Sequence, residues 1–172
     1  HEVEQLHEAF SRLETAIRSF GRYVPMEIVR KLMRVEQVAT VQVHRRPISI
    51  FFSDIAGFST ICEKLSPPRI LELLTEYFDE MEEIISSTNG TILEYVGDAI
   101  LAIWNAPLTD ELHAKLCLEA SIKMQTRLAK LRDSWKERGF PEVSIRCGVN
   151  TAEVFHGNLG SHKRLKYGVL GD

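Results

Sequence analysis

The sequence predicts an α+β protein, with an antiparallel-rich sheet that carries its helices on one face. Two observations favour this class. From residue 48 onward strand-like and helix-like apolar segments alternate, and only the tight turn Val96–Asp98 separates the two central strands. The 172 residues, 44% of them apolar, are enough to bury one core and leave an appendage.

The first half of the predicted domain contains one strand and one well-marked helix. Residues Ile48–Phe52 form a short, strongly apolar strand. Apolar residues then recur at helical spacing over residues 67–87, a segment that opens with two prolines and is followed by Asn89 and Gly90. Proline fits the first turn of a helix and glycine commonly ends one, so we expect a helix with about these bounds.

The second half begins with a predicted hairpin, whose strands are Thr91–Tyr95 and Ala99–Trp104. A long helix is predicted from about Asp110 to Arg138, where Gly139 stops it. The three remaining strands are predicted at Val143–Val149, Ala152–Phe155 and Leu165–Leu170.

The first twenty residues carry a different pattern, in which apolar residues alternate at spacings of four and three. These residues are Leu6, Phe10, Leu13, Ile17 and Phe20. Such a heptad stripe favours a helix that pairs with a second copy in a parallel coiled coil. An amphipathic helix that lies on its own domain has the same pattern, and this alternative stays open.

A proline interrupts the stripe at position 25, and a second short amphipathic helix is predicted for residues 26–33. The following residues are mixed and charged. We therefore divide the chain into a helical segment of residues 1–34, a connector of residues 35–47 and a globular domain of residues 48–172.

Composition excludes several classes of protein. A net charge of −3 gives no electrostatic reason to expect nucleic acid as a partner. No apolar run approaches the roughly 20 residues of a membrane span, and no signal peptide is recognisable. The cysteines Cys62, Cys117 and Cys147 lack metal-ligand spacing and predict reduced thiols. A cytoplasmic domain is expected, and both ends of the sequence resemble cuts through a longer protein.

Two aspartates follow apolar runs and are the strongest candidates for chemistry. Asp54 lies just after the first predicted strand, and Asp98 lies in the predicted hairpin turn. Ordinary turn chemistry explains either residue alone. Together, two carboxylates at neighbouring strand ends are what a pair of Mg²⁺ ions needs to hold a nucleoside triphosphate.

Four ordered motifs resemble the catalytic core of class III adenylyl and guanylyl cyclases: Phe52–Ser59, Tyr95–Ala102, Arg146–Thr151 and Gly157–Ser161. The resemblance covers roughly residues 45–172. It implies the ferredoxin-like fold of that family, truncated before its closing strands. Residues 1–34 resemble the coiled stalk and transducer helix that often carry signals into this domain, here from an upstream sensor domain.

The resemblance implies a head-to-tail homodimer with active sites at the interface. In each site, Asp54 and Asp98 would bind two Mg²⁺ or Mn²⁺ ions, with the Ile55 carbonyl as a further ligand. Arg146 falls on the family's phosphate-contacting arginine. The backbone N–H groups expected to complete the phosphate cradle are those of Ala56, Gly57, Phe58 and Ser59. The implied reaction converts a purine nucleoside triphosphate to a 3′,5′-cyclic nucleotide and pyrophosphate.

In the family, the residue four positions before the second metal-binding aspartate contacts the purine base. It is lysine in adenylyl cyclases and glutamate in guanylyl cyclases. This residue is Glu94 here. A carboxylate can accept the N1–H and 2-amino groups of guanine, whereas it repels the N1 acceptor of adenine. The second base-contacting position, usually cysteine in guanylyl cyclases, is Gly168 and offers no side-chain hydrogen bond. GTP is the expected substrate, with ATP or a mixed preference left open.

Family members carry an asparagine and an arginine shortly after the residues at which this sequence stops. We therefore expect residues 1–172 alone to have little or no turnover. An inactive regulatory module and a segment that serves only in dimerisation stay open, although both metal-binding aspartates argue against the former. Because a metal can activate the ribose hydroxyl, no histidine is needed as a base. Surface positions are expected for His113, His156 and His162.

Overall fold

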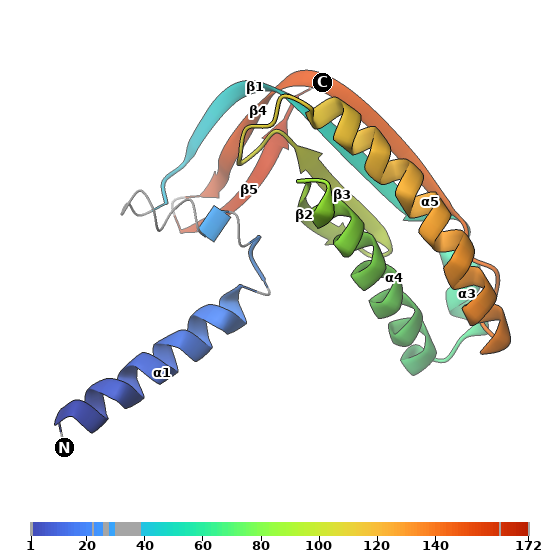
Figure 1. Ribbon diagram of the computed structural model, residues 1–172, viewed down its shortest axis with the longest axis horizontal. Coiled ribbons are helices and arrows are strands. Elements are labelled where there is room, and N and C mark those ends of the chain that lie inside the picture. The colour runs from blue at the N-terminus through green and yellow to red at the C-terminus, as the bar shows by residue number, and fades with distance from the viewer. Residues whose placement is uncertain (1, 22, 26–27, 30–38, 162, 172) are drawn as a thin grey trace. The chain divides into compact units, whose positions relative to one another are not determined.

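The computed structural model describes residues 2–21, 23–25, 28–29, 39–161 and 163–171 (Figure 1). The chain divides into two compact units, residues 1–40 and residues 41–172. The described part of the first unit is mainly helical, and the second unit is an α+β domain.

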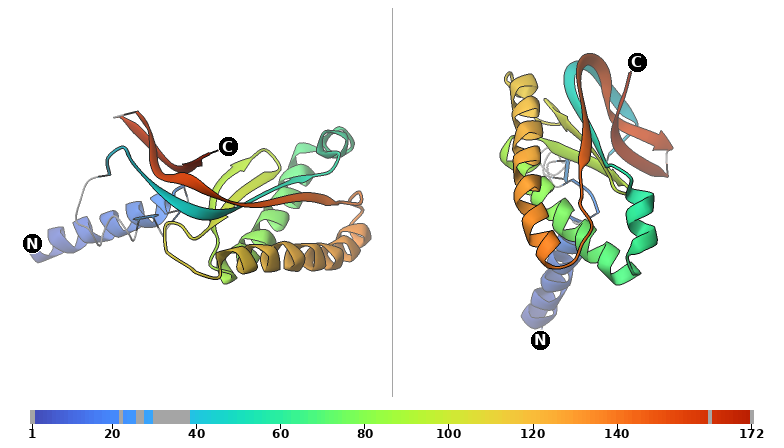
Figure 2. Two further views of the ribbon diagram at one scale, coloured as in Figure 1. Left: turned by 90° about the horizontal axis from the view of Figure 1, so that it is seen from above. Right: turned by 90° about the vertical axis from the view of Figure 1, so that its right-hand side faces the viewer.

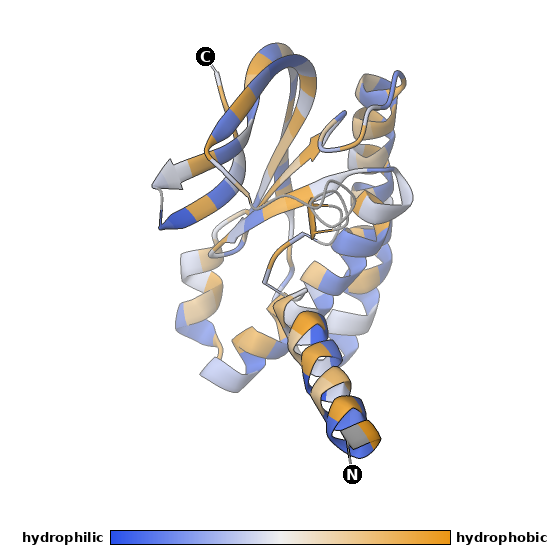
Figure 3. Cartoon of the chain, turned by 90° about the vertical axis from the view of Figure 1, so that its left-hand side faces the viewer, coloured by the Kyte–Doolittle hydropathy of each residue, from blue (hydrophilic) through white to orange (hydrophobic). Residues whose placement is uncertain are grey.

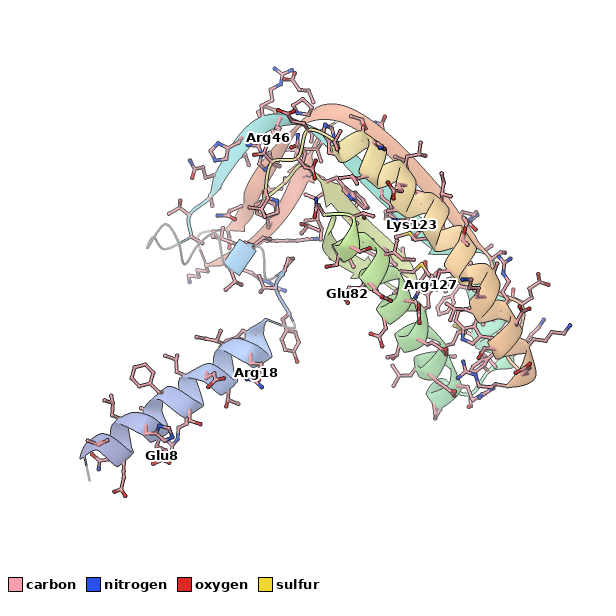
Figure 4. The ribbon with its side chains drawn as sticks, in the orientation of Figure 1. Glu8, Arg18, Arg46, Glu82, Lys123 and Arg127 are labelled. Carbon is pink, nitrogen blue, oxygen red and sulfur yellow. The ribbon has the colours of Figure 1, made fainter. Side chains whose placement is uncertain are left out.

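The first unit contains helix α1 (Glu2–Phe20). Its heptad side chains stay between 39% and 67% exposed, and Figure 3 shows apolar residues recurring along the helix. Arg18 pairs with Glu14 at 2.9 Å and Arg12 pairs with Glu8 at 2.5 Å, one turn apart on the polar side (Figure 4). The pairing of α1 with a second copy stays a prediction. The short helix predicted for residues 26–33 lies mostly outside the described residues.

The second unit is built on a five-stranded antiparallel sheet in the order β2-β3-β1-β4-β5. Its strands are β1 (Gln42–Ile55), β2 (Thr91–Val96), β3 (Ala99–Trp104), β4 (Ile145–Ser161) and β5 (Arg164–Leu170). The predicted hairpin of β2 and β3 is present. Because β3 pairs directly with β1, the turn of this hairpin lies beside the end of the central strand.

Helices α4 (Pro67–Ser87) and α5 (His113–Glu137) cover one face of the sheet (Figure 2). The shorter α3 (Phe58–Lys64) follows β1 and adds Ile61 to the same core. Strand residues such as Phe51 and Ile100 pack there against Leu73 of α4 and Met124 of α5, all of them buried. The α+β class with helices on one face is therefore confirmed.

Ion pairs join the solvent sides of α4 and α5. Arg127 of α5 contacts Glu80 and Glu83 of α4, the latter at 3.1 Å, and Figure 4 shows Arg127 between the two helices. Hydrogen bonds to these carboxylates raise the pKa of Arg127. None of the described helices combines the length and the apolar character that a membrane span requires.

Residues of β1 alternate between the two faces of the sheet, as they must in a strand. Phe51 and Ser53 are buried beneath the helices, whereas Phe52 is 45% exposed and Asp54 is partly exposed on the opposite side. Leu101 of β3 lies opposite Phe52 in the ladder. We call the side that carries Phe52, Asp54 and Leu101 the open face.

The connector predicted for residues 35–47 is wrong over residues 42–47. Strand β1 begins at Gln42 and pairs with β4 over its whole length, from Gln42 opposite Asn158 to Ile55 opposite Ile145. Pro47 is tolerated because the ladder with β3 begins only at Ser49, so no N–H is needed on that side. The Asn105 amide instead donates to the Pro47 carbonyl at 2.9 Å. The globular domain thus begins near residue 41, not at residue 48.

Two of the strands predicted in the last third of the chain are one strand. Residues 145–149 of the predicted segment 143–149, and the whole predicted segment 152–155, fall within the 17 residues of β4. Strands β1 and β4 bend together, and the far part of β4 continues into β5 (Figure 1). We call residues 42–47, 153–161 and 164–170 the arm. Its side chains Val154, Tyr167 and Val169 pack with Ile48 and Ile103 in a second, smaller core on the open side.

Candidate active site

Asp54 lies where the central strand leaves the core. The next residue, Ile55, is only 2% exposed, and the chain then turns through Gly57 in the left-handed conformation, with φ of 67°. A Cβ at Gly57 would meet no heavy atom within 4 Å, so glycine serves here for its backbone angle. The buried strand end fixes the backbone of Asp54, while its side chain is 33% exposed.

Asp98 is brought to the same point by the hairpin turn. Gly97 takes a left-handed conformation in this turn, with φ of 64°. The Asp98 carboxylate accepts a hydrogen bond from the Ile55 N–H at 2.8 Å through Oδ2. Because Ile55 directly follows Asp54, two acids that are 44 positions apart in the chain meet at one end of the sheet.

Arg146 completes a three-residue cluster with these acids. It lies directly opposite Asp54 in the ladder of β1 and β4, and its Nε donates to Asp54 Oδ1 at 2.7 Å. This hydrogen bond and the charges of Asp54 and Asp98 raise the pKa of Arg146. Arg146 therefore stays cationic, and its side chain, 72% exposed, is accessible to an anionic ligand.

The oxygen atoms of this cluster fit a divalent cation. Asp54 Oδ2 and Asp98 Oδ1 have no hydrogen-bond partner within the described part of the chain. The same part holds no group of three or more His, Cys, Asp or Glu side chains placed for a metal. The two carboxylates are therefore the side-chain candidates for binding a metal. Mg²⁺ is usually held by one or two carboxylates together with substrate phosphates.

Tyr77 of α4 lies beneath the acids on the helix-covered side. It is fully buried, and its hydroxyl lies 3.4 Å from Ser53 Oγ, next to Asp54. Burial, and then the charges of Cys147, Asp98 and Asp54, raise its pKa to about 12, whereas the contact with Ser53 acts in the opposite direction. Tyr77 was predicted only as an apolar helix position, since helical spacing does not show which core residue lies below a site.

The predicted phosphate cradle is only partly available. The Ala56 N–H donates to the Ser144 carbonyl at 2.8 Å and is therefore engaged within the protein. The N–H groups of Gly57, Phe58 and Ser59 belong to the first turn of α3, where no intrahelical acceptor precedes them. These three groups remain the candidates for binding phosphate.

Glu94 reaches the open face through a β-bulge. Ile92 pairs with Ala102 and Glu94 pairs with Leu101, so Leu93 is an extra residue in β2. In a regular strand Glu94 would share the helix-covered face with Ile92. The bulge instead turns Glu94 toward the open face, where Asp54 also lies. Strand alternation in the sequence gave no sign of this shift.

The Glu94 carboxylate is 41% exposed and accepts a hydrogen bond from Lys166 of β5. Lys166 was not among the predicted site residues. Gly168, the second predicted base contact, is buried in the same strand and lies opposite Gly157 of β4. The structure therefore places the Lys166 ammonium beside Glu94, the predicted base-reading residue. Position 168 contributes no side chain.

The expectation of surface histidines is wrong for His156 and incomplete for His113. His156 is 2% exposed, and its Nδ1 lies 2.9 Å from the Tyr167 hydroxyl in the arm. His113 is partly buried at the start of α5, with its Nδ1 2.8 Å from the Ser49 hydroxyl. Both histidines serve the packing of the arm and helices. His162 lies outside the described residues.

Comparison with known proteins identifies the family. Residues 41–172 match the adenylate and guanylate cyclase catalytic domain. Adenylate cyclase 1 of Rhizobium meliloti (strain 1021) is 34% identical over 171 residues, which cover 99% of this chain and 26% of that protein. The chain thus spans about a quarter of the length of this curated relative.

Solved structures agree with this match. The guanylyl cyclase Cya2 is 38% identical with a TM-score of 0.70, covering 74% of this chain and 65% of that chain. A bacterial light-regulated adenylyl cyclase is 26% identical with a TM-score of 0.84, and the match covers 98% of this chain and 49% of that chain. Similar proteins are thus named for both purine nucleotides. With its motifs, fold and matched length in agreement, the chain belongs to the family of class III adenylate and guanylate cyclase catalytic domains.

Proposed function

We propose that this domain converts GTP to 3′,5′-cyclic GMP and pyrophosphate, as part of a dimer. The observation that carries the proposal is the hydrogen bond from the Ile55 N–H to Asp98, which joins the two acids beside Arg146. Such a cluster of two carboxylates and one guanidinium can hold a metal-bound triphosphate and its developing negative charge.

In this reaction the ribose 3′-oxygen forms a bond to the α-phosphorus, and the bond from that phosphorus to the oxygen shared with the β-phosphate breaks, which releases pyrophosphate. The proton of the 3′-hydroxyl passes to solvent water. Asp54, Asp98 and the Ile55 carbonyl hold two Mg²⁺ or Mn²⁺ ions. When bound, these cations lower the pKa of the 3′-hydroxyl and offset the charge of the departing pyrophosphate. When the nucleotide binds, Arg146 donates a hydrogen bond to the phosphates in place of the one that it donates to Asp54. The N–H groups of residues 57–59 orient the phosphates.

Glu94 selects the base in this proposal. Its partly exposed carboxylate lies on the open face and can accept the N1–H and 2-amino groups of guanine. Adenine presents an acceptor at N1, which leaves the carboxylate without a partner. A site built around a hydrogen bond rejects the analogue that lacks it.

The partner is a second copy of the same chain. The open face exposes apolar side chains such as Phe52 and Val96, at 45% and 52%, and α1 exposes its heptad stripe. One chain can supply both the metal-binding acids and the base-reading glutamate, so a symmetric dimer would form two equal sites. In a head-to-tail arrangement Glu94 serves the metal site of the partner. Signals would reach the domain through α1 from an upstream sensor.

An adenylyl or dual-specificity cyclase is the second candidate, and two observations favour it. Gly168 provides no side chain to the base, so discrimination against ATP depends on fewer contacts than in a site with two base-reading side chains. The adenylate cyclase of Rhizobium meliloti is also among the similar proteins.

Product formation separates these functions. The full-length protein that carries residues 1–172 is supplied with GTP or ATP in the presence of Mn²⁺, and cyclic nucleotides are measured by chromatography. We expect cyclic GMP to form faster than cyclic AMP. A preference for ATP would refute the role of Glu94, and the absence of both products would favour an inactive regulatory module.

A further inference from the structure

Tyr95 directly follows Glu94 in β2 and contacts helix α4. Its ring centroid lies 4.4 Å from that of Phe78, and the two ring planes are tilted by 41°. Its hydroxyl donates to Oε2 of Glu82, an exposed residue of α4 that is labelled in Figure 4, at 3.3 Å. Tyr95 thus joins the strand that carries the predicted base-reading residue to a helix of the covered face.

The surroundings of Tyr95 keep its hydroxyl a hydrogen-bond donor. Partial burial raises its pKa, and so do the charge and the hydrogen bond of Glu82 and the charges of Asp79 and Tyr77. The phenol is therefore protonated at every pH at which the Glu82 carboxylate is charged. A hydrogen bond to a charged acceptor is stronger than one between neutral groups.

Two pairings of β2 with β3 are compatible with the first residues of β2. In both, Ile92 packs on the helix-covered face and Leu93 packs in the second core on the open side, as observed. Without a bulge, strand alternation would turn Glu94 toward the helix-covered face and Tyr95 toward the open face. The bulge reverses both directions, so that Tyr95 lies toward α4.

Neither Val96 nor the turn selects the bulged pairing. Regular pairing would direct Val96 to the helix-covered face, whereas the bulge leaves it 52% exposed. Regular pairing would also lengthen the turn at Gly97 and Asp98 to three residues, which is another common hairpin length. The interactions that favour the bulge are therefore the contact of Tyr95 with α4 and the charge of Glu94, which disfavours burial.

We propose that Tyr95 is a positioning residue, which holds β2 in the bulged register and so keeps Glu94 directed at the purine. Tyr95 acts through Phe78 and Glu82 of α4 and does not contact the nucleotide itself. The inference rests on the proposed function, in which Glu94 reads the base. Tyr95 thereby contributes to the preference for GTP over ATP from the opposite face of the sheet.

Tyr95→Ala tests this role in the full-length protein. We expect the ratio of kcat/KM for GTP over ATP to fall about tenfold, which corresponds to about 1.4 kcal/mol and is within the value of one aromatic contact. The loss should arise with GTP, because residue 94 then leaves the guanine for part of the time. Tyr95→Phe keeps the ring contact and should keep most of the ratio. Equal losses with both nucleotides would overturn the proposal, because a smaller folded fraction or a disturbed metal site affects both alike.

Phe78→Ala removes the same contact from the side of α4. It should lower the ratio as far as Tyr95→Ala does, and the double variant should lose little more than either single variant. Leu74→Ala is the matched control, since Leu74 lies one turn earlier in α4 and is also partly buried against the main core. It should lower the free energy of unfolding and leave the ratio unchanged. An equal fall of the ratio in Leu74→Ala would overturn the proposal, because any loosening of α4 would then suffice.

A labelling measurement tests the orientation of residue 94 without turnover. Glu94→Cys removes the charge, so that Tyr95 decides the direction of the new thiol, and mass spectrometry of its peptide follows alkylation by iodoacetamide. Adding Tyr95→Ala should slow this alkylation about fivefold, because the thiol then lies beneath α4 for most of the time. Adding Tyr95→Phe should leave the rate unchanged. The exposed Cys147 of β4 provides the internal reference rate.

The two measurements separate this inference from the proposed reaction. If the unmodified protein forms no cyclic product or does not prefer GTP, the proposed function fails. The alkylation rates still decide whether Tyr95 holds residue 94 on the open face. An unchanged or faster alkylation after Tyr95→Ala would overturn the inference even in an active guanylyl cyclase.

Discussion

The two faces of the sheet are built from the same strands but differ in what covers them. On the helix-covered face, Phe51, Ile100 and Ala102 are fully buried against α4 and α5. On the open face, Phe52 and the carboxylates of Asp54 and Glu94 remain partly exposed. Consecutive residues of β1 thus contribute alternately to the core and to the candidate active site.

This difference separates stability from activity at the level of single residues. Substitutions beneath the helices should change the free energy of unfolding, because they remove packed apolar volume. Substitutions on the open face should change nucleotide chemistry and leave the fold intact, because the charged groups there are exposed and contribute little to stability. The two sets of residues can therefore be tested independently.

Asp54→Ala should give the largest effect on the open face. The substitution removes a proposed metal ligand, and metal ions supply several kcal/mol of transition-state stabilisation. We expect cyclase activity to fall at least about 1,000-fold, since each 1.36 kcal/mol corresponds to a tenfold change in rate. The thermal unfolding midpoint should stay within a few degrees of the original value. Asp133→Ala, an exposed change on α5, should retain activity, and substantial activity in Asp54→Ala would refute the metal assignment.

Leu73→Ala tests the helix-covered face. Leu73 is fully buried in the core, whereas Leu71, two residues earlier in α4, is 67% exposed. Removing the buried side chain should lower the free energy of unfolding by about 2–5 kcal/mol, and Leu71→Ala should change it by less than about 0.5 kcal/mol. Urea denaturation measures both values. Similar losses in both variants would contradict the division between the covered core and the exposed helix surface.

Glu94→Lys should change base preference without changing stability. A lysine can donate to the N1 acceptor of adenine and has no acceptor for guanine. We expect the ratio of kcat/KM for GTP over ATP to fall on the order of 100-fold, within the range seen when a hydrogen-bonding site is mismatched. Glu137→Lys, near the end of α5, controls for the added charge. An unchanged ratio would mean that Glu94 does not contact the base.

The covered core could be predicted because its signals are local. The apolar spacing over residues 67–87 gives α4 with the observed bounds, and the Gly97-Asp98 turn gives the hairpin. The meeting of Asp54 and Asp98 also follows from sequence order, since a hairpin beside β1 must bring its turn to the end of that strand.

The open side was harder to predict because its geometry depends on irregularities between distant segments. The bulge at Leu93 depends on the register between β2 and β3, which strand alternation alone does not fix. Lys166 reaches Glu94 only because β1 and β4 bend and continue beyond the predicted strand ends. No local motif marks either feature. A proline at position 47 even suggested that β1 begins six residues later than it does.

Tyr77→Phe gives the smallest expected effect, confined to alkaline pH, and tests where the two faces meet. Tyrosine in an unfolded chain ionises near pH 10, whereas Tyr77 in the folded protein has a pKa of about 12. The stabilising contribution of the protonated hydroxyl is fully present below pH 10. Between about pH 10 and pH 12 the unfolded state releases the proton first, so this contribution is progressively lost.

The phenylalanine variant lacks this ionisation, so its free energy of unfolding should fall less over the same interval. The difference between the two proteins in the loss of unfolding free energy should approach about 1 kcal/mol by pH 11. This pH lies about one unit above the pKa of tyrosine in the unfolded chain, and one pKa unit corresponds to about 1.4 kcal/mol. Other groups with raised pKa values, such as Tyr167 and Cys117, are present in both proteins and cancel. Urea denaturation at pH 8, 10 and 11 measures the effect, with Tyr23→Phe at an 86% exposed position as the control. Parallel pH profiles for the two proteins would show that burial beneath α4 and the nearby charges do not raise the pKa of Tyr77 in the folded protein.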